Sequence, residues 1–136
     1  MNSLAGNRVV LWGAPQEDLN ALGKSLARRG FLVLAVDSPE QLRSIIRGQD
    51  VDLIVARLCR CFERPLLELL RWLQNVPAAP QVLIVADAMD VDLYLEAMRR
   101  GAFDCVGLPL NENELQRIVS QALATRHLRA AAGGRK

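Results

Sequence analysis

The chain has 136 residues, of which 51% are hydrophobic and 24% are charged, and its formal net charge is +2. This length predicts one domain, and the composition excludes an intrinsically disordered chain. The small net charge gives no reason to expect direct binding to nucleic acid.

Membrane insertion and secretion are not expected either. The longest apolar runs have about five residues, whereas a membrane-spanning helix needs roughly 20. The first residues lack the basic and apolar regions of a secretory signal. We therefore expect a cytoplasmic protein with no membrane contact.

The three cysteines, Cys59, Cys61 and Cys105, do not form the even set of a disulfide framework, so we expect reduced thiols. The lone histidine, His127, lies near the C-terminus, and we expect no closed four-ligand zinc site. Redox activity at Cys59 or Cys61 stays open, because it depends on exposure and on a lowered thiol pKa.

Five short runs of β-branched and aliphatic residues are the candidate strands. They are Arg8–Trp12, Phe31–Val36, Val51–Ala56, Val82–Ala86 and Cys105–Leu108. Continuous apolar runs of this length are typical of strands that are buried on both faces of a parallel sheet.

Segments with helical periodicity separate these runs. Apolar residues recur every three or four positions, which is typical of helices that pack one face on a sheet. These positions are Leu19, Leu22 and Leu26; Leu42, Ile45 and Ile46; Leu66, Leu69, Leu70 and Leu73; and Leu115, Ile118, Val119, Ala122 and Leu123. A further helix is expected over residues 91–101, where apolar groups cover more than one face.

Capping residues mark several predicted helix ends. Ser38, which a proline follows, reads as an N-cap, and Gly30 and Gly101 stand where helix C-caps are expected. Asn111 and Glu114 resemble a capping box, with asparagine in place of serine or threonine.

Strict alternation of strands and helices predicts a doubly wound α/β sandwich with right-handed crossovers. In such sheets, function gathers at the carboxyl ends of the strands. We expect a flexible N-terminus over residues 1–7, one domain over 8–126, and a basic flexible tail or linker over 127–136.

The segment EAMRRGAFDCVGLP, from Glu96 to Pro109, resembles the receiver domain of bacterial two-component response regulators. The segments RVVLWGAP, DLIVAR and PQVLIVADA fall in the same register, and the resemblance covers about residues 8–126. It implies a flavodoxin-like, CheY-like fold of five strand–helix units, with a parallel sheet in the strand order 2-1-3-4-5.

The resemblance also implies a chemistry, which is phosphoryl transfer from a histidine kinase to an aspartate at the end of the third strand. Carboxylates after the first strand would hold Mg²⁺, a hydroxyl after the fourth would bind the phosphoryl oxygens, and a lysine after the fifth would pair with them. Carried over by position, the acidic pair falls on Gly13 and Ala14, the acceptor on Arg57, the hydroxyl on Ala86, the lysine on Leu108, and an aromatic switch on Cys105.

None of these residues can perform the role of its position. Gly13 and Ala14 offer no metal ligand, and the guanidinium of Arg57 keeps its proton in proteins. We therefore expect a degenerate receiver, or pseudo-receiver, with no metal, no cofactor and no catalytic residue.

Arg57 itself has two interpretations. A buried guanidinium needs a partner, and the carboxylates of Asp37, Asp87 and Asp90 follow neighbouring strands. The alternative is an anion or nucleotide sensor that binds its ligand near Arg57 at the same edge of the sheet.

The leading hypothesis is a phosphorylation-independent module for protein–protein interaction. In the helix expected over 91–101, Leu93 or Tyr94 with Ala97 should pack on the sheet, which leaves some of Val91, Leu95 and Met98 towards solvent. The candidate interaction face is therefore formed by Val91, Leu95, Met98 and Cys105. Receivers commonly associate through helix four, strand five and helix five, so the resemblance implies a homodimer, a protein partner or a downstream output domain.

Overall fold

The computed structural model describes residues 7–13, 17–58, 63–86, 91–108 and 111–133. Strands and helices alternate along the chain, as the apolar pattern predicts. The elements are β1 (Arg8–Trp12), α1 (Glu17–Arg28), β2 (Leu32–Val36), α2 (Pro39–Gly48), β3 (Leu53–Arg57), α3 (Glu63–Leu73), β4 (Gln81–Ala86), α4 (Val91–Arg99), β5 (Asp104–Gly107) and α5 (Glu112–Gly133).

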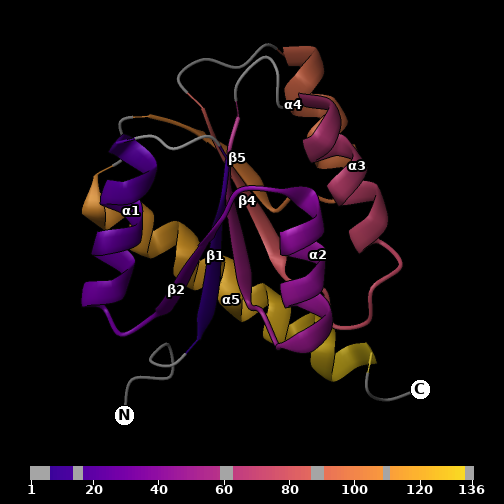
Figure 1. Cartoon of the computed structure of the whole chain (residues 1–136), viewed down its shortest axis with the longest axis horizontal. Coiled ribbons are helices and arrows are strands. Elements are labelled where there is room, and N and C mark those ends of the chain that lie inside the picture. Colours follow the sequence, from indigo (N-terminus) through magenta and orange to yellow (C-terminus); the bar gives the residue numbers. More distant parts are fainter. Residues whose placement is uncertain (1–6, 14–16, 59–62, 87–90, 109–110, 134–136) are drawn as a thin grey trace.

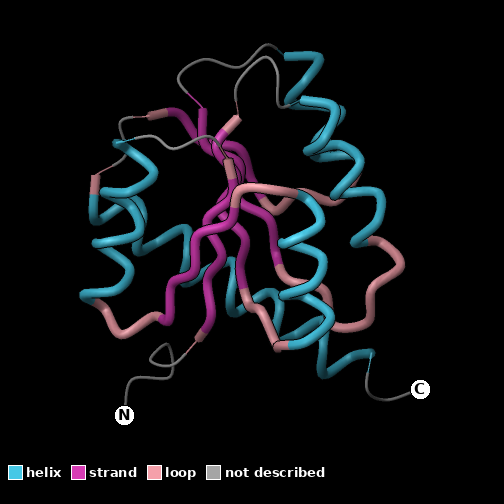
Figure 2. Tube along the Cα trace, viewed as in Figure 1, coloured by secondary structure: helices cyan, strands magenta, loops and turns pink. Residues whose placement is uncertain are grey.

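All five strands pair in parallel, in the order β2-β1-β3-β4-β5. Helices α1 and α5 cover one face of the sheet, and α2, α3 and α4 cover the other (Figures 1 and 2). The predicted flavodoxin-like (βα)₅ sandwich is therefore confirmed, including its strand order.

Alternate residues of the central strands enter opposite halves of the core. In β1, Val9 and Leu11 pack towards α1 and α5, whereas Val10 and Trp12 pack towards α2, α3 and α4. The strands β3 and β4 divide in the same way, and every residue of both is buried. Burial on both faces explains why these runs are continuously apolar.

The edge strand β2 departs from the prediction. Its sequence is as apolar as that of the central strands, yet the side chains of Leu32 and Leu34 are 51% and 38% exposed. The strand pairs only with β1 among the described residues, so one side of it has no neighbouring strand. An apolar run alone does not distinguish an edge strand from a central one.

The predicted caps form at the helix ends. The backbone N–H of Gln41 donates to the hydroxyl of Ser38 at 3.1 Å. Gly30 and Gly101 have φ values of 95° and 103°, in the left-handed region that glycine tolerates at a helix C-terminus. At the start of α5, the N–H of Glu114 donates to the side-chain oxygen of Asn111 at 2.8 Å.

Helix α5 continues to Gly133, past the predicted domain boundary at Arg126. Residues 127–133 therefore extend this helix, where a flexible tail was expected. Before that extension, the buried side chain of Arg126 attaches α5 to Asp52, which precedes β3, and to the carbonyl groups of Ala78 and Ala79, which precede β4.

Candidate functional site

The carboxyl edge of the sheet brings together the positions that the resemblance marks as a phosphorylation site. Arg57 ends β3 and lies in register with Val85 of β4. The next residue, Ala86, accepts a hydrogen bond from the backbone N–H of Leu108 at 2.9 Å. Gly13 follows β1 and approaches Arg57 closely. Ala14 lies outside the described residues.

Gly13 has no room for a side chain. A β-carbon at this position would lie 2.9 Å from the β-carbon of Arg57 and 3.0 Å from its carbonyl oxygen. The φ value of Gly13 is 147°, a conformation that residues with side chains rarely adopt. The backbone therefore excludes a metal-binding carboxylate from this position unless the β1 and β3 ends move apart.

Arg57 is buried, with 8% of its surface exposed. Its Nη1 group donates to the carbonyl oxygen of Leu58 at 3.0 Å, so part of the guanidinium is bound to the adjacent backbone. Of the predicted carboxylate partners, Asp37 is exposed and forms no ion pair with Arg57 in the described part of the chain. Asp87 and Asp90 lie outside the described residues.

Apolar groups fill the two remaining positions. Ala86 is buried in the core beneath α2, α3 and α4, and Leu108 packs against the core on the opposite face. Neither side chain can bind a phosphoryl oxygen. The described residues also contain no group of three histidine, cysteine, aspartate or glutamate side chains that could hold a metal. The described residues of this edge therefore do not fit the Mg²⁺ ion that the resemblance implies.

The predicted interaction face on α4 is partly exposed. Val91 is 70% exposed and Leu95 is 50% exposed, while Ala97 packs fully into the core. Of the two residues that could join Ala97 on the sheet, Leu93 does so, since it packs against the core while Tyr94 is 39% exposed. Met98 is partly buried and also packs against the core, so Val91 and Leu95 are the apolar residues of the predicted face that lie towards solvent.

Cys105 lies beside α4 at the start of β5 and is half-buried. Burial raises the pKa of its thiol to about 11, and the neighbouring Asp104 carboxylate adds to the rise. The thiol is therefore protonated at neutral pH and is a poor nucleophile. Cys59 and Cys61, the two candidates for redox activity, lie outside the described residues.

The sequence matches no protein-family model and no curated protein. Solved structures do resemble the fold. A response regulator from Thermotoga maritima has a TM-score of 0.76 at 20% identity, over 88% of this chain and 98% of that chain. NtrX from Brucella abortus, in complex with ADP, has a TM-score of 0.80 at 16% identity, over 95% of this chain and 29% of that chain. The beryllofluoride-activated NtrC4 receiver domain dimer has a TM-score of 0.74 at 14% identity, over 88% of this chain and 98% of that chain.

The chain has the fold of a response-regulator receiver domain. Identities this low establish the fold alone, so the chemistry of the receiver fold in this chain rests on its own residues. Within the described residues, no helix is both long enough and apolar enough to cross a membrane.

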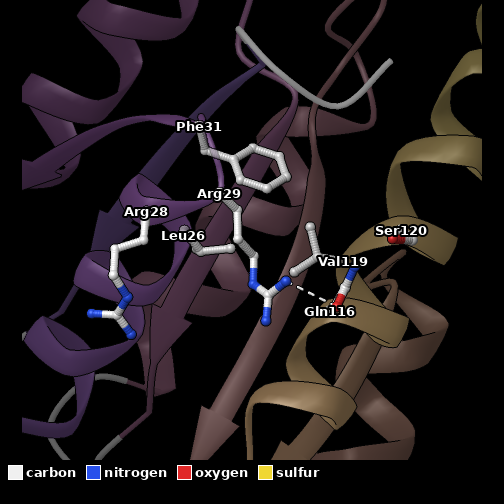
Figure 3. A pocket seen from close by; sticks show the side chains of 7 residues that line it. All are labelled: Leu26, Arg28, Arg29, Phe31, Gln116, Val119 and Ser120. Atoms are coloured by element: carbon white, nitrogen blue, oxygen red, sulfur yellow. Dashed lines mark hydrogen bonds between the residues drawn. The ribbon is translucent and has the colours of Figure 1, made fainter. Parts of the chain in front are cut away.

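One feature of this receiver fold was not predicted from the sequence. A cavity of about 350 Å³ lies between the end of α1 and the side of α5, away from the carboxyl edge of the sheet (Figure 3). Its polar groups include Arg28 and Arg29, which precede the helix-ending Gly30. The sequence Arg28-Arg29-Gly30 could have indicated a positively charged helix end. It could not have indicated the cavity, because the residues on the other side, Gln116, Val119 and Ser120, come from α5.

Proposed function

We propose that this receiver fold acts as a phosphorylation-independent module for protein–protein interaction, with no enzymatic activity. The observation that carries the proposal is the buried guanidinium of Arg57 at the position of the phosphate acceptor. A guanidinium cannot form an acyl phosphate, and its fixed positive charge repels a divalent cation.

The backbone around Arg57 supports the same proposal. Replacing Arg57 by aspartate would restore the acceptor alone, because Gly13 has no space for a metal-binding side chain. The apolar Ala86 and Leu108 would still offer no partner to the phosphoryl oxygens. Several independent changes therefore separate this chain from phosphoryl transfer.

Incubation with acetyl phosphate and Mg²⁺, followed by intact-mass spectrometry, tests this part of the proposal. We expect no added phosphoryl group, while a phosphorylatable receiver domain treated in parallel gains one. An aspartyl phosphate on this chain would contradict the proposal, and peptide mapping would locate the acceptor. The variant Arg57→Asp should also stay unmodified, because the residues at the metal and hydroxyl positions have no side chain that could bind Mg²⁺ or a phosphoryl oxygen.

For the interaction surface, we propose the exposed side of α4 together with β5 and α5. The surface offers the apolar side chains of Val91, Tyr94 and Leu95, which are between 39% and 70% exposed. Glu96 beside them forms ion pairs with Arg99 and Arg100 at 2.8 and 2.5 Å, which gives the apolar patch a charged rim. An apolar centre with a polar rim is the usual composition of a protein interface.

A second copy of the chain is the partner that can be tested directly. We expect Leu95→Asp to abolish concentration-dependent dimer formation in sedimentation velocity experiments. Leu32→Asp is a matched control, because Leu32 has a similar exposure, 51% against 50%, but lies on β2 at the other edge of the sheet. Equal effects of the two variants, or a wild-type chain that stays monomeric at every concentration, would contradict a dimer through α4. A fused or separate protein domain would then be the partner to test on this surface.

The alternative of an anion or nucleotide sensor at Arg57 gains no support from the contacts of this residue. Its Nη1 group is already bound to the carbonyl of Leu58, and the side chain is buried. The described cavity lies elsewhere, between α1 and α5.

A further inference from the structure

Two arginines of α2 lie over one tryptophan of α3. The Cζ atoms of Arg43 and Arg47 are 5.7 and 5.5 Å from the centre of the Trp72 ring. Both distances fall within the range of about 6 Å in which an aromatic ring attracts a cation. These three residues form the Arg–Trp cluster, on the face of the sheet that α2, α3 and α4 cover (Figure 1).

The cluster is accessible from solvent. Arg47 is exposed, and Arg43 and Trp72 are partly exposed. The Nε group of Arg43 is shielded, so its outer Nη groups are the donors that a ligand can reach. Trp72 also packs against the core, which fixes the position of its ring. The ring therefore holds two guanidiniums at the surface of the domain.

No carboxylate of the described residues neutralises the cluster. Glu40 lies one turn before Arg43, and Glu68 lies one turn before Trp72, but neither forms an ion pair with the two arginines in the described part of the chain. By contrast, the two consecutive arginines at the end of α4 share the carboxylate of Glu96. The Arg–Trp cluster thus keeps its full positive charge.

The two guanidiniums repel each other. Arg43 and Arg47 are four positions apart on one helix, where like charges are unfavourable. Among the described residues, no acceptor contacts the Nη groups of either arginine. An anionic acceptor that reaches both guanidiniums would relieve the repulsion and form charge-assisted hydrogen bonds with them.

The spacing of the two arginines fits carboxylates on a peptide. A rise of 1.5 Å per residue separates Arg43 and Arg47 by about 6 Å along α2. Side chains on one face of an extended peptide repeat at a similar distance, about 6.7 Å. A nucleic acid fits less well, because it is bound through many phosphate contacts and the net charge of this chain is only +2.

We propose that the Arg–Trp cluster binds an acidic segment of a protein partner. Two carboxylates on alternate residues of that segment pair with the guanidiniums of Arg43 and Arg47, and Trp72 holds both guanidiniums in position. The proposal adds a second surface to the proposed interaction function. The cluster shares no residue with the α4 surface, so its test and the dimer test can fail separately.

Tetraglutamate is a suitable probe, because its alternate side chains carry carboxylates, and tetraglutamine is its neutral counterpart. Titrations at low ionic strength are followed by NMR through the indole N–H of Trp72 and the Nε–H signals of Arg43 and Arg47. The indole of Trp12 is buried and serves as the internal reference. We expect saturable shifts with tetraglutamate, with a Kd of about 1 mM, and none with tetraglutamine.

The variants Arg43→Gln and Arg47→Gln should each weaken tetraglutamate binding by about fivefold. Arg117→Gln is the matched control, because it removes one charge from an exposed position of α5, on the other face of the sheet, and binding should be unchanged. Trp72→Leu keeps both charges but removes the ring, and it should weaken binding by about threefold. Circular dichroism checks that each variant is folded.

Several results would overturn the proposal. They are the absence of a saturable shift with tetraglutamate, equal binding of tetraglutamine, and equal effects of Arg43→Gln and Arg117→Gln. Inorganic phosphate that shifts the same signals with equal affinity would also overturn it, since charge alone would then explain binding. Tighter binding of a single-stranded oligothymidylate would overturn it in favour of a nucleic-acid site.

Discussion

Arg126 and Asp52 form a buried ion pair in which Nη1 and Oδ1 lie 2.7 Å apart, and neither side chain is more than 8% exposed. Asp52 also accepts a hydrogen bond from the backbone N–H of Arg8 at 2.9 Å. The same guanidinium contacts the carboxylate of Asp50 and two backbone carbonyls. This cluster connects α5 to the amino ends of three strands, β1, β3 and β4.

Removal of Arg126 should therefore destabilise the domain strongly. We expect Arg126→Ala to lower the free energy of unfolding by about 3–5 kcal/mol, because it leaves the carboxylate of Asp52 buried without its cation. Asp50→Asn is the control, since Asp50 is 71% exposed, and its loss should cost about 0–1 kcal/mol. Urea denaturation measures the free energy of unfolding of both variants. Equal losses in the two variants would show that burial does not determine how much each ion pair stabilises the domain.

Gly13 should tolerate no side chain. We expect Gly13→Ala to reduce the free energy of unfolding by about 1–3 kcal/mol, because the residue has positive φ and a β-carbon would contact the backbone of Arg57. Gly107→Ala is the matched control at the same edge of the sheet, where a β-carbon meets open space. Gly107→Ala should raise the free energy of unfolding by about 0.5–1 kcal/mol in urea denaturation. If Gly13→Ala left the free energy of unfolding unchanged, the ends of β1 and β3 would have to separate easily.

Glu112 should contribute to stability only above acidic pH. Its pKa lies below the ordinary value of 4.5, because Arg28 donates a hydrogen bond to its carboxylate and attracts the negative charge. A depressed pKa in the folded state means that the contribution is complete above pH 4.5 and is lost as the pH falls through the lower value. The pKa can be read from the side-chain carboxyl signal by NMR. Arg28→Gln should raise it towards 4.5, and an unchanged value would rule out this ion pair in solution.

Cys105 should react slowly with thiol reagents. Since the pKa of its thiol is raised to about 11, its thiolate fraction at neutral pH is on the order of a hundredfold below that of an exposed cysteine. Iodoacetamide labelling with peptide-level mass spectrometry follows this residue separately from the other two cysteines. Asp104→Asn should speed the labelling only modestly, because burial is the larger cause of the shift. Rapid labelling of the native protein would contradict the burial of this thiol.

Local patterns explain what the sequence predicted well. The alternation of apolar runs and helical periods, together with the caps at Ser38, Gly30 and Gly101, is determined by neighbouring residues. The loss of the phosphorylation site stays a prediction, but the meeting of two of its positions follows from strand ends that lie side by side in a parallel sheet. Gly13 and Arg57 do meet at this edge.

Features that join distant segments were not predicted. The partners Arg126 and Asp52 are 74 residues apart in the sequence, and Arg29 and Gln116, which meet at the cavity, are 87 apart. No periodic pattern links such positions. The exposure of β2 was missed for a related reason, since an apolar run carries no information about how many strands flank it.

The charges at the two ends of β3 have a further consequence. A buried carboxylate, that of Asp52, stands directly before the strand, and a buried guanidinium, that of Arg57, ends it. The carboxylate at the amino end is matched by the guanidinium of Arg126. The guanidinium at the carboxyl edge stands at the position that the resemblance gives to the phosphate acceptor. We therefore expect added Mg²⁺ to leave the thermal stability of the domain unchanged.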